Sequence, residues 1–157
     1  MKLARPNRIR HSYTQRIDAT PEAVFPLLCP VRELEWTRGW NPSLVLSDSG
    51  VAEAGCVFVT PGTPEDTIWI VTRHEPEHLR LEMLLVTPHR TVGKLEISLR
   101  GDGEGGTAAE VAYTHTSLGP RGDAFLEGFT EDAYRELMES WEAELNHFLS
   151  TGEKLTV

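Results

Sequence analysis

Apolar residues near the C-terminal end of the chain recur three or four positions apart, which is the period of an α-helix. The pattern predicts one long amphipathic helix over Phe125–Leu149, packed by its apolar stripe against a surface of matching length. The stripe consists of Phe125, Phe129, Ala133, Leu137, Trp141, Leu145 and Phe148. The charged positions expected to face water are Glu127, Glu131, Asp132, Arg135, Glu136, Glu139, Glu142 and Glu144.

Earlier in the chain the period changes to two, which is typical of half-buried strands. Thr67–Glu75 is apolar on both faces, so the pattern does not assign its inner face. Tight turns between the segments, such as Gly101–Gly106, indicate antiparallel neighbours, and one apolar face per strand indicates a sheet covered on one side. The predicted strands are Arg8–Ile17, Leu44–Ser47, Cys56–Thr60, Thr67–Glu75, Leu79–Thr87, Thr91–Arg100 and Thr107–Leu118.

Two short helices are predicted between the first and second strands. Thr20 is suited to an N-cap, and Pro21 to the first helical position. Pro30 interrupts the helix that follows, because proline lacks a backbone donor and disfavours helix at the preceding residue. A second short helix is therefore expected over Val31–Trp36.

Composition narrows the class of protein. A chain of 157 residues with 39% hydrophobic content suffices for one domain, expected over 1–157 with its core at about 9–150. A net charge of −9 argues against nucleic acid as a partner. No apolar run approaches 18 residues, so stable membrane insertion is not expected. Cys29 and Cys56 lack metal-ligand spacing, which favours a cytoplasmic protein with reduced thiols and neither a metal nor a cofactor.

The order of elements and the segment Ile17–Phe25 resemble the START-related superfamily, also called SRPBCC. Its members include lipid-transfer domains, polyketide cyclases, plant allergens and activators of a heat-shock ATPase. The resemblance implies an α+β helix-grip fold, in which an antiparallel sheet of about seven strands wraps a long C-terminal helix. The segment Cys29–Trp40 is similar to a bacterial subgroup without an assigned function, and it carries no catalytic motif.

The resemblance also implies an apolar cavity between sheet and helix, with the first strand beside the last and the short helices at one mouth. His11, Tyr13 and Gln15 would then lie across from Val111, Tyr113 and His115. The residues expected to line the cavity are His11, Tyr13, Gln15, Trp36, Trp40, Trp69, Met83, Leu95, Tyr113, His115, Phe129 and Trp141.

Five residues are candidates for acid–base chemistry in such a cavity, although no catalytic residue is assigned. His11 and His115 titrate near neutrality, and Tyr113 or Tyr13 would serve as a proton donor. Glu33, on the second short helix, comes just before Trp36 and Trp40, and an aromatic, poorly solvated mouth would raise the pKa of its carboxyl group. Each of these side chains has a structural alternative, as a hydrogen-bonded core residue or a surface charge.

Three functions stay open at this point. The leading hypothesis is a protein that binds or carries a small hydrophobic or aromatic molecule, as a monomer or homodimer. The first alternative is an enzyme of the cyclase, aromatase or dehydratase type acting on a polyketide-like substrate. The second is a protein-interaction module resembling the ATPase activators, using its outer sheet face or acidic helix. Fold alone does not choose among them, because function depends on the site.

Overall fold

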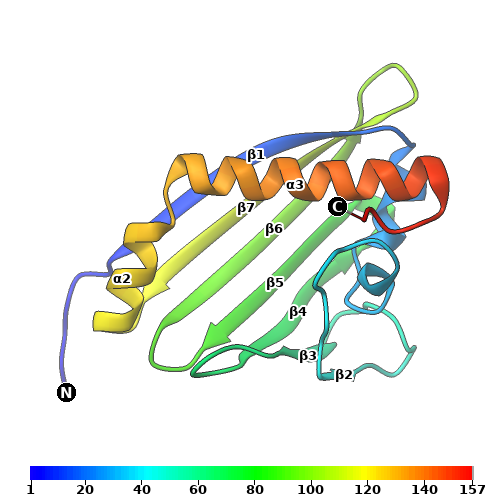
Figure 1. Cartoon of the computed structure of the whole chain (residues 1–157). Coiled ribbons are helices and arrows are strands. Elements are labelled where there is room, and N and C mark those ends of the chain that lie inside the picture. Colours follow the sequence, from blue (N-terminus) through cyan, green and yellow to red (C-terminus); the bar gives the residue numbers. More distant parts are fainter. Residues whose placement is uncertain (157) are drawn as a thin grey trace.

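The computed structural model, described for residues 1–156, contains a seven-stranded antiparallel sheet crossed by a long helix (Figure 1). The strand order is β1-β7-β6-β5-β4-β3-β2, so the first strand pairs with the last and the others form a meander. The strands are β1 (Arg8–Ile17), β2 (Leu44–Leu46), β3 (Val57–Thr60), β4 (Thr67–Glu75), β5 (Arg80–Thr87), β6 (Thr91–Gly101) and β7 (Thr107–Ser117). The helix-grip fold predicted from the sequence is thereby confirmed.

The pairing of β1 with β7 places the first and last strands of the sheet side by side. His11 lies opposite Tyr113 and Tyr13 lies opposite Val111, while Gln15 faces Ala109. The alternating pattern of β1 places Gln15 and Ile17 in the core, because successive side chains of a strand point to opposite faces. The prediction that β1 and β7 lie side by side is confirmed, but the residues that face each other differ from those expected.

Short helical turns follow β1 and close one end of the sheet. They are α1 (Pro21–Val24), η1 (Phe25–Leu27) and η2 (Arg32–Glu35), of which the last two are 3-10 helices. Two indole N–H groups hold this region to its own backbone: Trp36 donates to the carbonyl oxygen of Leu27 at 3.0 Å, and Trp40 donates to that of Pro30 at 2.7 Å. Helical segments lie on both sides of Pro30, as predicted, but each consists of short turns rather than one regular helix.

The predicted single helix over Phe125–Leu149 is wrong at its start. The chain forms α2 (Pro120–Gly128) and then α3 (Glu131–Thr151), with the interruption at Phe129 and Thr130. The hydroxyl group of Thr130 accepts a hydrogen bond from the backbone N–H of Ala133 at 3.1 Å, so Thr130 caps α3. An N-cap followed by two acidic residues is a local helix start, and it prevails over the apolar period that continues through it.

Because α3 begins at its own N-cap and does not continue α2, the residues that it buries also differ from the predicted stripe. The residues that bury most of their surface against the sheet are Tyr134, Met138 and Leu145, whereas Leu137 is 56% exposed. The Tyr134 hydroxyl donates to the carbonyl oxygen of Val111, and Gln15 donates from its amide to the carbonyl oxygen of Met138 at 3.1 Å. These two bonds tie α3 to β7 and β1.

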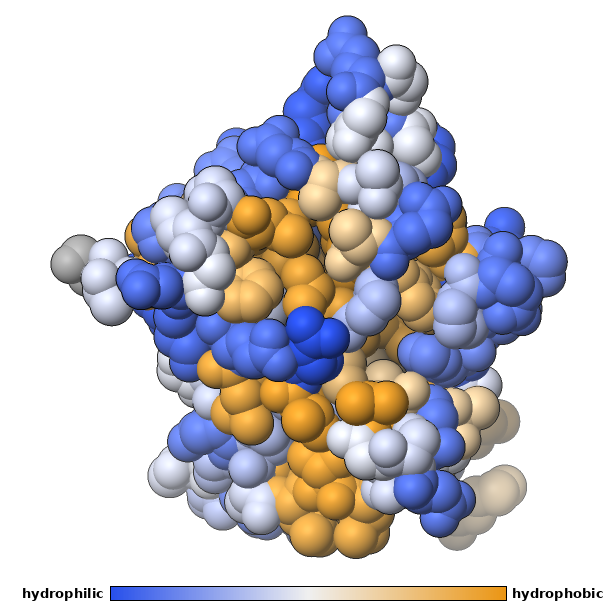
Figure 2. Space-filling model, turned by 90° about the vertical axis from the view of Figure 1, so that its right-hand side faces the viewer, coloured by the Kyte–Doolittle hydropathy of each residue, from blue (hydrophilic) through white to orange (hydrophobic). Residues whose placement is uncertain are grey.

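The structure also assigns the inner face of β4. Trp69 and Val71 point inward, while Ile68 and Ile70 are exposed at 46% and 39%. Figure 2 views the end of the molecule that carries the short helices, where apolar side chains gather on part of the surface between polar regions. Within residues 1–156, no helix is both long and apolar enough to cross a membrane.

Candidate functional site: a cavity between sheet and helix

A cavity of about 230 Å³, here called the main cavity, lies between the inner face of the sheet, α3 and the segment that follows η2. Aliphatic and aromatic side chains make up most of its wall, as expected for a site that takes small organic molecules. The lining residues are Glu33, Thr37, Arg38, Trp40, Phe58, Trp69, Leu81, Met83, Leu95, Ile97, Tyr113, Leu137, Met138, Ser140, Trp141 and Glu144.

A second space of about 330 Å³ adjoins the main cavity on the side of α2 and is here called the α2 cavity. The two spaces share Trp69, Tyr113 and Leu137 as wall residues. Ligand pockets in proteins measure roughly 300–1,000 Å³, so the two spaces together reach that range while the main cavity alone falls short of it. The α2 cavity is lined by Thr67, Trp69, Leu85, Arg90, Tyr113, His115, Phe125, Phe129, Ala133, Tyr134 and Leu137.

A cluster of aromatic rings forms one wall of the main cavity. Phe58 stacks on Trp69 with ring centroids 5.2 Å apart, and Trp40 meets the edge of Trp69 at 6.4 Å. The sequence places Phe58 and Trp69 opposite each other because β3 and β4 pair in antiparallel register. Such rings offer flat apolar area and negative faces to a bound molecule.

An ion pair at the mouth of the main cavity joins the segment after η2 to α3. Glu144 accepts hydrogen bonds from the backbone N–H of Arg38 at 2.8 Å, from the Arg38 Nε at 3.2 Å and from the Ser140 hydroxyl at 3.3 Å. Glu144 is only 6% exposed, so the prediction that it faces water is wrong. A buried carboxylate with several donors is well satisfied, and here it fixes the mouth to the helix.

Glu33 extends its side chain from η2 into the main cavity. Unlike Glu144, it has no hydrogen-bond donors around its carboxyl group in the part of the chain that the structure describes. Within residues 1–156, its carboxyl group takes part in no hydrogen bond or ion pair, although its backbone N–H donates to Cys29 at 2.8 Å. Burial among protein atoms raises the pKa of this carboxyl group to about 8, because the charged form loses its hydration without a compensating partner.

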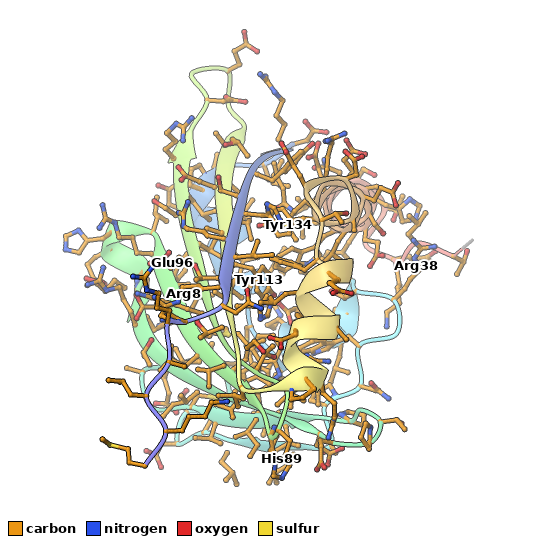
Figure 3. The ribbon with its side chains drawn as sticks, turned by 90° about the vertical axis from the view of Figure 1, so that its left-hand side faces the viewer. Arg8, Arg38, His89, Glu96, Tyr113 and Tyr134 are labelled. Atoms are coloured by element: carbon orange, nitrogen blue, oxygen red, sulfur yellow. The ribbon has the colours of Figure 1, made fainter. Side chains whose placement is uncertain are left out.

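Tyr113 and His115 point inward from β7 and stack on each other with centroids 5.7 Å apart. Figure 3 shows Tyr113 between the sheet and the helices, with Tyr134 nearby and Glu96 on the outer side of the sheet. Burial raises the pKa of the Tyr113 hydroxyl, and the negative charge of Glu33 adds to this effect. Tyr113 borders both cavities, so it can contact a molecule in either.

His115 is neutral at physiological pH. Burial and then the positive charge of Arg90 lower the pKa of His115 to about 4. Its Nδ1 is buried without a hydrogen-bonding partner among the described residues, and it packs on Gly93, where a Cβ atom would come within 2.8 Å. His115 also meets the rings of Phe125 and Phe129 edge-on at 5.0 and 4.8 Å.

The structure brings together most of the side chains that were predicted to line a cavity. Four of the predicted residues lie elsewhere, and each has its own local role. His11 bonds through Nε2 to the carbonyl oxygen of Phe129 at 2.8 Å, so it supports the break between α2 and α3. Gln15 bonds to α3, Trp36 is fully buried in the core, and Tyr13 packs against the edge of that core. The predicted residues that border a cavity are Glu33, Trp40, Trp69, Met83, Leu95, Tyr113, His115, Phe129 and Trp141.

Several cavity residues were absent from the prediction. Phe58 follows from the inward alternation of β3, which its short length concealed. Tyr134 and Met138 follow once the helix is started at the Thr130 N-cap, since they are then four residues apart on one face. Thr37 and Arg38 lie in a segment without regular structure, where periodicity carries no signal.

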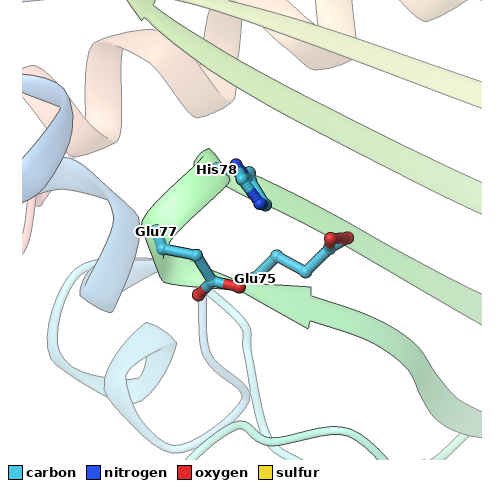
Figure 4. A group of neighbouring side chains, drawn as sticks. All are labelled: Glu75, Glu77 and His78. Carbon is cyan, nitrogen blue, oxygen red and sulfur yellow. The ribbon is translucent and has the colours of Figure 1, made fainter.

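Glu75, Glu77 and His78 meet at the turn between β4 and β5 (Figure 4). Their potential ligand atoms lie within 4.8 Å of one another. Glu77 and His78 are exposed, and Glu75 already lies 2.9 Å from the guanidinium group of Arg73. Exposed acidic groups of this kind are common at turns, so the trio adds no feature to the candidate site.

Comparison with solved structures identifies the class of fold. Norcoclaurine synthase from Thalictrum flavum, solved as a point mutant with a transition-state analogue, superposes with a TM-score of 0.69 at 9% identity over 96% of this chain and 99% of that one. A second structure of that enzyme, in complex with dopamine and hydroxybenzaldehyde, gives 0.66 at 9% identity over 92% and 88%. A protein from Rhodobacter sphaeroides gives 0.62 at 22% identity over 92% and 93%.

At these identities the likeness concerns the fold. No protein-family model matches the chain, and neither does any curated protein. The chain has the helix-grip fold, as the order of its elements predicted.

Proposed function

We propose that this protein binds a small, largely apolar aromatic molecule in the space between the sheet and α3. The observation that carries the proposal is the main cavity itself, in which Trp40, Phe58 and Trp69 form an aromatic wall around a few polar groups. Apolar lining with few convergent polar groups is the usual construction of a small-molecule site. Norcoclaurine synthase, which shares the fold, has been solved with two small aromatic molecules, dopamine and hydroxybenzaldehyde.

Filling the cavity should weaken binding without unfolding the protein. Met83 points into the main cavity from β5, whereas its neighbour Leu84 lies on the opposite face of the strand. We expect Met83→Trp to weaken binding of a neutral indole such as tryptophol by at least about tenfold, because a ligand and the new ring compete for one volume. Titration of the purified protein by calorimetry measures this effect.

Leu84→Trp is the matched control, since it adds the same ring one residue away on the outer face. Circular dichroism would establish that both variants are folded. Undiminished binding by Met83→Trp, or equal loss in both variants, would contradict the proposed location of the site. Native mass spectrometry of freshly purified wild-type protein provides the complementary test, in which a stoichiometric adduct identifies the natural ligand.

A second candidate function, acid–base catalysis, is favoured by the unpaired Glu33 carboxyl group. A base with a pKa near the working pH combines a usable charged fraction with useful proton affinity. In this scheme the Glu33 carboxylate removes an α-proton from a bound ketone, and the Tyr113 hydroxyl donates a hydrogen bond to the resulting enolate oxygen. The histidines are less suited to this role, since His11 supports the α2–α3 break and His115 has a low pKa.

The catalytic scheme predicts exchange of α-protons into solvent. Phenylacetone incubated with the protein in D2O should exchange at least about a hundredfold faster than with Glu33→Gln, in keeping with the usual contribution of a positioned base. Proton NMR of the ketone measures the rate. Glu35→Gln, on the same turn and exposed, should exchange like the wild type. Equal rates in all three proteins would exclude Glu33 as a base, while leaving the binding function intact.

A further inference from the structure

The wall of the main cavity presents two side-chain groups that have no hydrogen-bond partner among residues 1–156. One is the Glu33 carboxyl group, and the other is the Thr37 hydroxyl, whose oxygen is buried without a partner. The two residues are four apart, and the Thr37 N–H donates to the Glu33 carbonyl oxygen at 2.9 Å, so both side chains project from one turn. The Thr37 oxygen is fully buried, and buried polar groups are almost always satisfied, so it indicates a missing partner. The Glu33 carboxyl group is partly exposed, and it presents a second free acceptor beside that hydroxyl.

The charges around this pair favour a positive partner. Arg38 is the cation that borders the main cavity, and it is already engaged by Glu144 at the mouth. Arg90 belongs to the α2 cavity, where its guanidinium carbon lies 4.0 Å from the centre of the Phe125 ring. The other titratable group that faces Glu33 is the Tyr113 hydroxyl on β7, which is neutral and influenced by the Glu33 charge. A carboxylate at Glu33 therefore has no protein cation to pair with among residues 1–156.

The aromatic wall suits the same kind of partner. Trp40, Phe58 and Trp69 lie within 5.2 to 6.4 Å of one another by ring centroid, and they border the same cavity as Glu33. Ring faces attract cations and also stack on flat apolar groups. A carboxylate and a hydroxyl beside such rings form an acceptor set for an ammonium group attached to an aromatic body.

We propose that the ligand of this cavity is a small aromatic molecule carrying a basic nitrogen, whose ammonium group pairs with Glu33 and Thr37. This inference rests on the proposed binding function and names the chemical class of its ligand. The aromatic part lies against the Trp40, Phe58 and Trp69 rings, and the ammonium group supplies the donors that the unpaired oxygens lack. The alternative ligand for a protonated Glu33 is a carbonyl compound, which would accept a hydrogen bond from the carboxylic acid.

The two ligand classes differ in their proton balance. With a pKa of about 8, Glu33 is about nine-tenths protonated at pH 7 in the empty protein. An ammonium ligand needs the carboxylate, so its binding at pH 7 releases close to one proton and tightens as the pH rises towards 8. A carbonyl ligand needs the protonated acid, so it binds without releasing a proton and weakens above pH 8.

Calorimetry with tryptamine and with tryptophol, which carries a hydroxyl in place of the amine, tests the inference. Titrations at pH 7 in phosphate and in Tris give the number of protons released from the difference in apparent enthalpy. We expect tryptamine to release about one proton and to bind about fiftyfold more tightly at pH 8 than at pH 6, following the ionised fraction of Glu33. Tryptophol should show neither effect.

Matched variants assign these effects to Glu33. Glu33→Gln should bind tryptamine at least about tenfold more weakly at pH 8, and its binding should neither release a proton nor depend on pH. Its loss of tryptophol affinity should be much smaller than its loss of tryptamine affinity. Glu35→Gln should behave as the wild type with both probes. Thr37→Val should weaken tryptamine by a smaller factor than Glu33→Gln.

Three results would overturn the inference. If tryptamine and tryptophol bind equally and Glu33→Gln changes neither, the cavity binds aromatic molecules without selecting a cation, and the proposed function stands alone. If tryptophol binds more tightly than tryptamine and weakens above pH 8, Glu33 acts as a neutral donor. If neither probe binds at millimolar concentration, the binding function fails along with the inference.

Discussion

Replacing Glu33 by Gln is expected to flatten the pH dependence of stability. The folded-state pKa of Glu33, about 8, lies above its reference value of 4.5, so the unfolded chain gives up its proton first as the pH rises. The group therefore costs the wild type nothing well below pH 4.5, and the cost grows until the pH passes 8. From pH 5 to pH 8.5, the free energy of unfolding of Glu33→Gln should rise relative to that of the wild type by roughly 4 kcal/mol.

Urea denaturation at both pH values measures this difference. Glu35→Gln is the control, because Glu35 lies on the same turn, is exposed and pairs with Arg32 at 2.7 Å. Exposed ion pairs contribute little, so its pH profile should follow that of the wild type to within about 1 kcal/mol. Parallel pH profiles for Glu33→Gln and the wild type would show that the carboxyl group is solvated and that its charge costs the folded protein nothing.

Replacing Gly122 by Ala is expected to destabilise the protein by roughly 2–3 kcal/mol, although alanine normally stabilises a helix. Gly122 lies in the first turn of α2 and is buried. A Cβ atom there would overlap the carbonyl oxygen of Arg90 and come within 2.9 Å of the Ser117 Cα. Both obstacles are at or beside backbone, so α2 must move away from β7 and the Arg90 turn.

Gly128 provides a control on the same helix, because a Cβ atom at that position meets nothing within 4 Å. Gly128→Ala should be neutral or stabilising by up to about 1 kcal/mol. Thermal unfolding of the two variants checks the contrast. Equal stabilities would mean that α2 adjusts its position at little cost. If α2 moves in Gly122→Ala, the contact between Phe125 and His115 should also change, which the side-chain resonances of His115 would report.

The elements of the sheet were predictable because their signals are local. Period-two alternation and turn residues fixed β1 and β4 to the residue, and the long strands β5 to β7 to within one residue at either end. The predicted start of the long helix was wrong because two local signals compete there. The apolar period runs through Phe129 without interruption, and the N-cap at Thr130 decides the boundary. Both signals are in the sequence, and the shorter-range one prevailed.

The candidate site was also predictable only in part. The sequence indicated an apolar, aromatic-rich interior, and the nearness of Glu33 to Trp36 and Trp40 indicated a carboxyl group with a raised pKa. Composition and local spacing are enough for both predictions. Whether the side chain finds a partner depends on contacts between residues far apart in the chain. Arg38 and Glu144 are 106 positions apart and pair at the mouth, whereas Glu33 remains unpaired inside. Only the tertiary structure decided this, since a local pattern contains no information about which distant group a carboxylate will meet.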